Sequence, residues 1–196
     1  MNFFKIIIGL SNPINKYYDT RHNVGSWYIK ILSKKYLISL KKKNKFKGYL
    51  GKIKFFDEYI YVFIPNFFMN LNGKYIFSLL SFYNISYKNI LIIHDELDLL
   101  PGEIKFRYGF GHNGHNGLKS IFNFFKKKKF YRLSIGIGRP NNCNKISSYV
   151  LSSPSIQDKK KIINIINFSI SFIKVFIKNI NISYINKLFL NKINVF

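Results

Sequence analysis

Apolar runs and helical stripes alternate along the chain, and this alternation predicts a sheet covered by helices. Apolar runs of strand length lie at residues 3–9, 46–56, 59–64, 89–93, 104–108 and 131–138. Apolar positions at helical spacing lie at residues 24–32, 71–83 and 118–125, followed by a long Ile/Phe-rich segment at 158–178 and a short one at 184–190. The pattern predicts an α/β fold: a single-domain α/β/α sandwich whose twisted sheet is mixed and mostly parallel, with helices on both faces.

Length and apolar content bound the organisation of the chain. With 196 residues, the chain is long enough for one domain with a sizeable core and short for two. We expect one domain over residues 1–196, with a motif-bearing core at about 3–153 and a helical region at about 155–191. Lys and Asn interrupt the long apolar segments, so no transmembrane helix is expected. The single cysteine, Cys143, excludes an internal disulfide framework and is typical of a cytoplasmic protein.

The chain is strongly basic, with 32 Lys and Arg against 8 Asp and Glu and a formal net charge of +24. Lysines form runs within residues 41–47, 126–129 and 159–161. Such a charge favours a polyanionic partner, of which nucleic acid is the natural one. The chain is also rich in Asn, Ile, Phe and Tyr and poor in Ala, as expected from an AT-rich genome. Solvated lysine faces without a partner are therefore the alternative interpretation.

Polar side chains stand where the predicted strands meet loops and helices. The positions are Asn12 and His22 after the first strand, Asn70 before the second helix, Asp95 after the 89–93 strand, and His115 and Asn116 before the third helix. In an open α/β sheet, such junctions can converge on one crevice at the strand ends. Imidazole can take a proton from water near neutral pH, a carboxylate can orient the imidazole, and amides can hold a carbonyl. These residue types favour hydrolysis by water.

The sequence offers neither a covalent nucleophile nor a metal site of recognisable spacing. It has no GxSxG elbow, and Cys143 lies in a different loop from any histidine. His112 and His115 form an HxxH pair near the acidic residues of 95–98, but a glycine-rich turn does not set the tetrahedral geometry that zinc needs. We therefore expect no metal and no cofactor.

Three other polar residues near these junctions have structural interpretations. We expect His94 to support the end of its strand, and Glu96 and Asp98 to shape the following turn and cap its backbone. The candidate site residues have structural alternatives too. His22 could be a polar residue at a helix entrance, and the asparagines could be ordinary loop or cap residues in an Asn-rich chain.

Four segments in fixed order carry most of these polar residues. They are GLSNPINKYYDTRHNVGSW at 9–27, FFMNLNGK at 67–74, HDELDLLPGEIKFRYGFGHNGHNG at 94–117 and YRLSIGIGRP at 131–140. Together they closely resemble the bacterial peptidyl-tRNA hydrolase family. The resemblance implies cleavage of the ester that joins a nascent peptide to the 3′-terminal ribose of tRNA. It also implies a one-domain α/β/α fold, a monomer, and no metal.

The resemblance implies roles for single residues. His22 corresponds to the general base and Asp95 to the carboxylate that orients it. The amides Asn12, Asn70 and Asn116 correspond to residues that hold substrate and water, Tyr17 and Met69 to residues of the crevice, and Arg107 to a tRNA contact. Further candidates for substrate or tRNA binding are Lys105, Lys145 and His115, of which His115 is either structural or a weak substrate contact. We expect attack by a water that His22 activates, with the developing oxyanion held by amide donors.

Three loop positions depart from the family pattern. Ile14 stands where the family usually has the glycine of NPG, so that turn is built with a β-branched residue. Asn113 replaces a glycine of GHGGHNG, and Phe110 interrupts the glycine run before it. Asn tolerates left-handed backbone geometry well, so Asn113 is the easier of the two to accommodate.

Two further departures bear on tRNA binding. The family senses the tRNA 5′-phosphate with a pair of basic residues, of which the first matches Arg107 and the second is Ser134 here. Cys143 replaces another basic residue, and Lys145 is its candidate substitute. We expect tRNA affinity to rest on diffuse charge. The alternative function is a catalytically inactive, basic tRNA- or RNA-binding protein of the same fold, against which the intact His22 and Asp95 argue.

Overall fold

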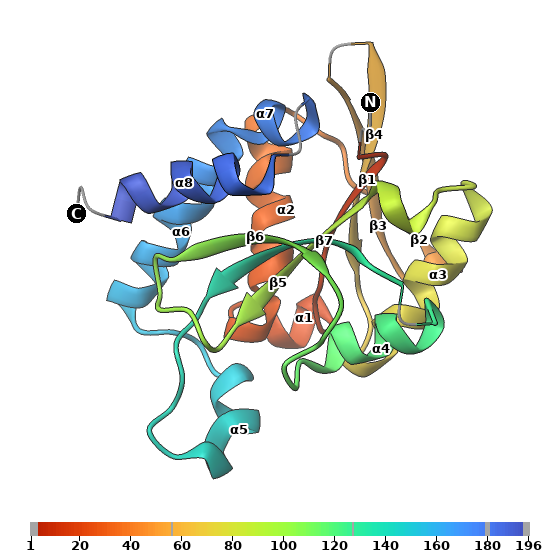
Figure 1. Cartoon of the computed structure of the whole chain (residues 1–196). Helices are drawn as coiled ribbons and strands as arrows, with labels where there is room; N and C mark the ends of the chain where they lie inside the picture. Colours follow the sequence, from red (N-terminus) through yellow and green to blue (C-terminus); the bar gives the residue numbers. More distant parts are fainter. Residues whose placement is uncertain (1–3, 56, 127, 179–180, 194–196) are drawn as a thin grey trace.

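The computed structural model describes residues 4–55, 57–126, 128–178 and 181–193 (Figure 1). Phe3, Phe56 and Lys127, which belong to predicted strands or to a lysine run, lie outside these residues. The strands are β1 (Ile6–Gly9), β2 (Lys41–Lys43), β3 (Gly48–Phe55), β4 (Glu58–Pro65), β5 (Ile90–Glu96), β6 (Ile104–Gly109) and β7 (Phe130–Gly136). The α-helices are α1 (Ile14–Tyr17), α2 (Val24–Lys35), α3 (Asn72–Phe82), α4 (Asn116–Phe124), α5 (Ile146–Val150), α6 (Ile156–Ser171), α7 (Ile173–Lys178) and α8 (Ile182–Ile193).

The strands form one seven-stranded sheet in the order β2-β3-β4-β1-β5-β7-β6. β1 pairs in parallel with β4 and β5, and β5 pairs in parallel with β7. β3 and β6 run against their neighbours, so the other five strands point the same way. The predicted α/β class with a mixed, mostly parallel sheet is therefore confirmed, as is the pairing of the 46–56 and 59–64 runs as neighbouring strands.

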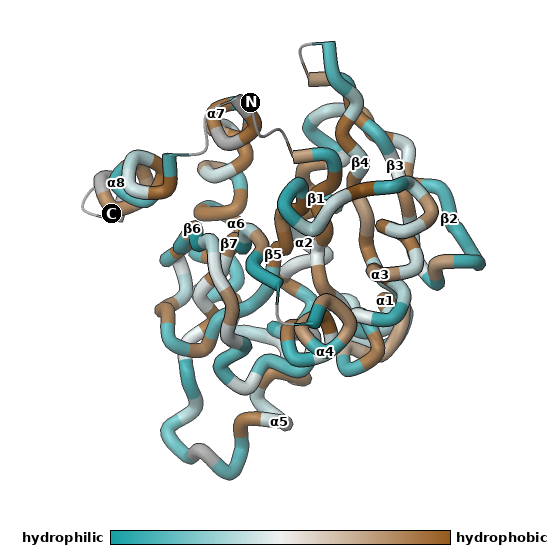
Figure 2. Tube along the Cα trace, turned by 45° about the vertical axis from the view of Figure 1, so that its right-hand side comes forward, coloured by the Kyte–Doolittle hydropathy of each residue, from teal (hydrophilic) through white to brown (hydrophobic). Residues whose placement is uncertain are grey.

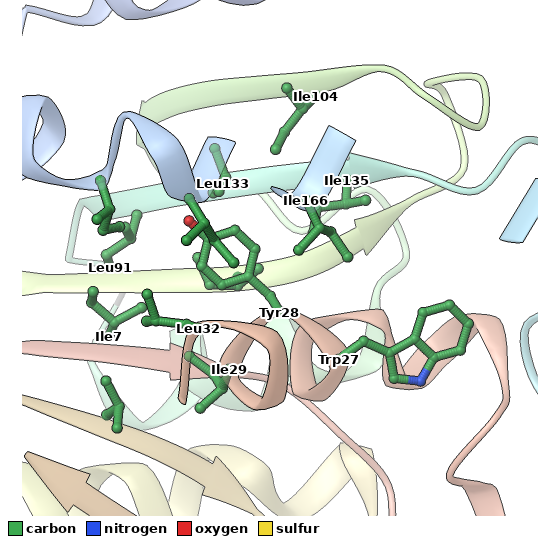
Figure 3. Close-up of a cluster of buried hydrophobic side chains, with 14 of the residues drawn as sticks. Ile7, Trp27, Tyr28, Ile29, Leu32, Leu91, Ile104, Leu133, Ile135 and Ile166 are labelled. Carbon is green, nitrogen blue, oxygen red and sulfur yellow. The ribbon is translucent and has the colours of Figure 1, made fainter. Parts of the chain in front are cut away.

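Helices cover both faces of the sheet, and each face has its own hydrophobic core (Figure 1). On one face, Tyr28 and Leu32 of α2 belong to a cluster with Leu91 of β5, Leu133 of β7 and Ile166 of α6 (Figure 3). On the other face, α3 and α4 pack against each other and against β1, β4 and β5. Burial of one such Leu or Ile side chain contributes about 1.5–3 kcal/mol. The two cores together hold the strand ends in fixed positions.

The two edges of the sheet are protected in different ways. At one edge, β2 is short and consists of three exposed lysines, and Figure 2 colours it as hydrophilic. At the other edge, the Asn186 side chain on α8 donates from Nδ2 to the Phe106 carbonyl and accepts from the Phe106 N–H at 2.9 and 2.8 Å. Charged edges and covered edges both prevent pairing with strands of other molecules. Part of the lysine run at 41–47 therefore has a structural role.

Two glycines set the position of α2 over the sheet. A Cβ on Gly25 would lie 2.6 Å from the Ile93 carbonyl oxygen and from the Leu10 nitrogen. A Cβ on Gly9 of β1 would lie 2.0 Å from the Gly25 carbonyl oxygen. Backbone can approach backbone this closely only where both residues lack a side chain. The start of α2, and with it His22 three residues before Gly25, is thus held directly against β1 and β5.

The structure differs from the sequence predictions in several elements. β5 continues beyond Ile93 to Glu96, because β7 offers ladder partners as far as Gly136. Asp95 therefore lies within the strand and not in the loop after it. The long helix predicted at 158–178 is interrupted near Phe172 and forms α6 and α7. The sequence analysis predicted none of α1, β2 and α5.

Membrane-spanning segments are not found in the part of the chain that the structure describes. None of its helices is both long and apolar enough to cross a bilayer.

We predict that Gly25→Ala will lower the free energy of unfolding by roughly 1–3 kcal/mol, because the added methyl group has no space between α2, β1 and β5. Chemical denaturation followed by circular dichroism measures this change. Gly109→Ala is the matched control, because its Cβ would meet only Arg132 Nη2 at 3.9 Å. Equal stability of the two variants would contradict the close approach.

Candidate active site

The centre of the site is a buried pair, His22 and Asp95. His22 belongs to a one-turn 3-10 helix, η1 (Arg21–Asn23), directly before α2, and Asp95 is the penultimate residue of β5. His22 Nδ1 lies 3.0 and 2.9 Å from the two Asp95 carboxylate oxygens. The two residues are only 7% and 4% exposed. A nitrogen this close to a carboxylate carries the proton and donates it, so Nε2 is the basic nitrogen of neutral His22.

His115 is a second imidazole bound to the same carboxylate. Its Nε2 lies 3.0 Å from Asp95 Oδ1. Its Nδ1 accepts hydrogen bonds from the backbone N–H groups of Gly117 and Leu118 at 3.1 and 3.3 Å, which makes His115 the side-chain cap of α4. Because Nδ1 is an acceptor, Nε2 carries the proton and donates it to Asp95. Sequence reasoning placed His115 among the substrate contacts and gave no sign of this bridging position.

Burial and the neighbouring charges shift the pKa values of His22 and Asp95 in opposite directions. Burial lowers the pKa of His22, but the negative charge of Asp95 and its hydrogen bond outweigh burial, so the His22 pKa is raised above its ordinary value of 6.5. Burial raises the pKa of Asp95, but His22 and His115 hold it well below its ordinary value. Asp95 is therefore ionised across the physiological range, and His22 titrates above 6.5.

His94 supports this arrangement from the neighbouring position. Its Nδ1 donates to the Asp95 carbonyl at 2.7 Å, and its Nε2 accepts from the Ser134 hydroxyl at 3.0 Å. Burial, followed by the nearby His115, lowers the pKa of His94 to about 3. The neutral ring packs edge-on against His115 with centroids 5.2 Å apart. These contacts are those of a strand-end support, as the sequence predicts.

Asparagines hold the loops around the pair. Asn12 Oδ1 accepts from the Met69 N–H at 2.9 Å, and Asn23 Oδ1 accepts from the Asn12 N–H at 2.8 Å. Asn72 Nδ2 donates to the carbonyls of Ser11 and Phe68, each at 3.0 Å. Asn23 and Asn72 are completely buried. Sequence reasoning missed both, although they lie inside the segments TRHNVG and FFMNLNGK, because nothing local distinguishes a buried asparagine from an exposed one.

Asn70 and Asn116 have free side chains. Asn70 lies in a 3-10 turn before α3, and Asn116 is the first residue of α4. Both residues are exposed and both line the same cavity as His22. Among the residues that the structure describes, neither amide side chain has a hydrogen-bond partner. Two amides are therefore available to a ligand in the cavity.

The cavity has a volume of about 570 Å³ and is lined by residues at the carboxyl ends of β1 and β5 and by residues of α4 and α5. Its polar lining comes from the pair and the amides, and its apolar lining from Met69, Phe68, Leu97 and the α5 region. The full lining is Asn12, His22, Phe68, Met69, Asn70, His94, Asp95, Glu96, Leu97, His112, Asn113, Gly114, His115, Asn116, Asn144, Ile146, Ser147, Val150 and Leu151. Its size and mixed lining suit a small part of a larger substrate.

Four predicted contact residues lie outside this lining. Tyr17, at the end of α1, is partly buried and has the Lys16 ammonium 5.4 Å from its ring. Arg107 on β6 lies directly opposite Arg132 on β7, and Lys105 lies directly opposite Ser134. Lys145 is exposed, immediately before α5.

The backbone accommodates two of the three loop residues that depart from the family pattern, Ile14 and Asn113, without strain. Ile14 is the first residue of α1 and is not among the residues with positive φ, and its N–H donates to Asn66 Oδ1 at 2.7 Å, so this turn does not require glycine. Asn113 takes the left-handed conformation, with φ of 44°. Phe110 is 64% exposed, and its carbonyl accepts from Arg132 Nη2 at 3.2 Å.

A metal does not fit the group that His22, Asp95 and His115 form. Their potential ligand atoms lie within 4.8 Å of one another, which is close enough to consider a cation. However, His115 Nδ1 is occupied by two backbone donors, so its Nε2 bears a proton and has no lone pair for a metal. A metal ligand at this position would need the other tautomer and the loss of the α4 cap. The group is instead built around the Asp95 carboxylate, which accepts hydrogen bonds from the N–H groups of two imidazoles.

Sequence and structure comparisons identify close relatives. A sequence model of the family Peptidyl-tRNA hydrolase matches residues 6–194. The chain belongs to the peptidyl-tRNA hydrolase family. Its peptidyl-tRNA hydrolase relative from Buchnera aphidicola subsp. Cinara cedri is 50% identical over 186 residues, which cover 91% of this chain and 97% of the relative. The relative from Buchnera aphidicola subsp. Acyrthosiphon pisum is 51% identical over 155 residues, 79% of this chain and 88% of the relative.

The fold agrees with a crystal structure from the same family. Peptidyl-tRNA hydrolase from Acinetobacter baumannii superposes with a TM-score of 0.89 at 33% identity, over 96% of this chain and 95% of that chain. The resemblance seen in the four sequence segments is thus confirmed over nearly the whole chain.

We predict that Asp95→Asn will lower the hydrolytic rate about 10²–10⁴-fold and move the acid limb of the pH profile to lower pH. In the native protein, the rate should fall as the pH drops through a His22 pKa above 6.5, because only neutral His22 accepts a proton. The amide removes the charge that raises this pKa, while burial still lowers it. The measurement is kcat/KM over about pH 5 to 9.

Asp98→Asn is the control for this profile, because Asp98 is exposed and is bound to Arg139 Nε at 2.7 Å. An acid limb that stays in place in Asp95→Asn would show that the limb does not report His22.

Proposed function

We propose that the chain cleaves the ester of peptidyl-tRNA by direct attack of a water that His22 activates. The peptidyl-tRNA hydrolase activity follows from the family, and the proposal concerns which residues perform it. The observation that carries the proposal is the binding of His22 Nδ1 by Asp95, which leaves Nε2 as the base in a residue that lines the cavity. Nε2 takes a proton from water, the hydroxide attacks the ester carbonyl, and the proton then passes to the departing ribose oxygen.

Asp95 has two functions in this mechanism. It fixes the His22 tautomer that presents Nε2, and it stabilises the imidazolium that forms when the water is deprotonated. His115 supports Asp95 from the other side and connects it to the positive N-terminal end of α4. We therefore assign His115 a positioning role in place of the substrate contact that the sequence predicts.

The free amides suit the carbonyl and the water. Asn70 and Asn116 line the cavity and their side chains have no hydrogen-bond partner among the described residues, so their N–H groups are available to an oxyanion and their oxygens to the attacking water. Asn12 differs from them, because its Oδ1 already accepts from Met69. We propose that Asn12 acts mainly by holding the 69–70 segment in place, with its Nδ2 directed to substrate.

For the tRNA we propose binding by spread positive charge. Lys105 and Arg107 lie on β6 and Lys145 directly before α5, all three outside the cavity, and we propose them as contacts for phosphates of a bound tRNA. Ser134 is buried and bonded to His94, so it cannot serve as the second arm of a phosphate clamp. Loss of that arm makes the many other lysines more important. We further propose that the chain acts as a single domain and a monomer in the cytoplasm.

We predict that His22→Ala will lower cleavage of an N-blocked aminoacyl-tRNA about 10²–10⁴-fold while tRNA binding is retained, because the base is lost and the charged surface is not. Release of the blocked amino acid is measured with EDTA in every reaction. His112→Ala is the matched control, because His112 is an exposed histidine of the same cavity.

Near-normal turnover by a folded His22→Ala variant would refute water activation by His22. Binding without cleavage by the native chain would favour the inactive tRNA-binding alternative, and activity lost to EDTA would favour a metal.

We predict that tRNA affinity will weaken roughly 10²–10³-fold between about 50 and 200 mM salt, as expected for about five phosphate contacts. Filter binding or fluorescence anisotropy measures the Kd. The control is cleavage of an N-blocked aminoacyl-adenosine, which has no phosphates and should respond little to salt. An affinity for tRNA that barely changes with salt would reject binding by diffuse charge.

A further inference from the structure

We propose that Glu96 recognises the 3′-terminal adenosine of the substrate by accepting a hydrogen bond from its hydroxyl or amino group. The inference rests on the proposed function, because it names a substrate contact in the same cavity. Glu96 is the last residue of β5, next to Asp95, and it has no part in the mechanism above. It would be a binding residue that confers specificity.

Glu96 is a buried carboxylate without an ion-pair partner. The residue is only 6% exposed, yet it lines the cavity. Across the ranges that the structure describes, no Lys, Arg or His lies within ion-pair distance of its oxygens. Within the described part of the chain, the one hydrogen bond to its carboxylate is long, from the Asp98 N–H to Oε1 at 3.4 Å. A buried carboxylate normally accepts two or more strong hydrogen bonds, so its oxygens retain capacity for a donor from the cavity.

The position of Glu96 on the sheet indicates which part of the substrate it meets. Alternation along the strands puts Glu96 on the same face of the sheet as Arg132 and, on the next strand, Lys105 and Arg107. Lys105 is exposed and Arg107 partly exposed, so both suit phosphate groups, whereas Arg132 is buried and donates to the Phe110 and Gly111 carbonyls. The carboxylate at the cavity end of this face repels phosphates. A polyanion that follows this face therefore reaches Glu96 only with a part that lacks phosphate. The terminal nucleoside, whose ribose carries the peptide ester, is that part.

The chemistry of a carboxylate limits the donor to two groups of the nucleoside. Carboxylates accept hydrogen bonds from ribose 2′-hydroxyls in nucleotide-binding folds and from exocyclic amines of bases. The terminal adenosine offers both, as its 2′-hydroxyl and its N6 amine. Either donor would form the same kind of hydrogen bond with the carboxylate. Two substrates, one without the 2′-hydroxyl and one without the amine, distinguish them.

The simpler interpretation is that Glu96 only shapes the turn after β5, as the sequence predicts. The bond to Asp98 N–H fits that role but is near the limit of hydrogen-bond length. Glu103 shows what a turn-capping carboxylate looks like in the same loop: its Oε2 accepts from the Leu100 N–H at 2.8 Å, and it does not line the cavity. Glu103→Ala is therefore the matched control variant.

The experiment compares native protein, Glu96→Ala, Glu96→Gln and Glu103→Ala on N-blocked aminoacyl-tRNA. We expect Glu96→Ala to raise KM roughly tenfold with little change in kcat, because a contact made equally in the ground and transition states is lost. Glu96→Gln keeps an acceptor oxygen and should show a smaller rise. Glu103→Ala should leave KM unchanged. Thermal unfolding of each variant separates loss of folding from loss of binding.

The second arm of the experiment changes the substrate. Two modified tRNAs end in 2′-deoxyadenosine or in purine riboside, which lacks the amine, and each carries the same ester at the 3′ position. We expect the native protein to prefer the unmodified substrate over one of them by about tenfold, and Glu96→Ala to lose that preference. The substrate that loses the preference identifies the donor.

Several outcomes would overturn the inference. Equal kcat/KM of the native protein on all three substrates would do so, even if Glu96→Ala failed to fold. A preference that persists unchanged in the Glu96 variants would assign recognition to another residue. A lower KM in both variants would mean that the carboxylate acts only by repelling phosphate. Failure of the native protein to cleave the unmodified substrate would instead refute the proposed function.

Discussion

The Asp95 carboxylate is the interaction on which the rest of the site depends. It lies in the interior, where an isolated charge is costly, and two imidazoles from different parts of the chain donate hydrogen bonds to it. These bonds fix the tautomers of both rings: His22 has a free Nε2, and His115 has an Nδ1 that caps α4. A change at Asp95 would therefore alter the base, the helix start and the cavity wall together.

The fold brings Asp95, His22 and His115 together and packs each of them closely. The central strand β5 carries Asp95, and the facing glycines of β1 and α2 hold His22 against it. The helix α4, packed on α3, brings His115 from the other side. Buried asparagines then connect the loops that the strands leave open, because loop carbonyls inside a protein need donors. These contacts hold the candidate site in place although several of its residues lie outside the regular strands and helices.

In the proposed function, chemistry and tRNA binding use different physical means. The proposed base and its carboxylate, His22 and Asp95, are buried and paired. The positive charge is spread over exposed lysines, and some of them also serve the fold, as in the edge strand β2. A chain under compositional pressure toward lysine can therefore lose a specific basic contact, such as the one at Ser134, and still attract a polyanion. The cavity differs from this positively charged surface, because the two carboxylates that line it, Asp95 and Glu96, are acidic.

The sequence alone determined the class of fold, the strand and helix positions of the central motifs, and the residues His22, Asp95, Asn12, Asn70 and Asn116 as candidates. Apolar periodicity and the four polar segments are local signals, and they survive in a chain rich in Lys, Asn and Ile. Tertiary structure alone decided that β5 extends through Asp95 to Glu96, that His115 bridges Asp95 and α4, and that Asn23 and Asn72 hold the loops. Each of these depends on a partner 20 or more residues away or on burial from all sides, and neither leaves a pattern in the neighbouring sequence.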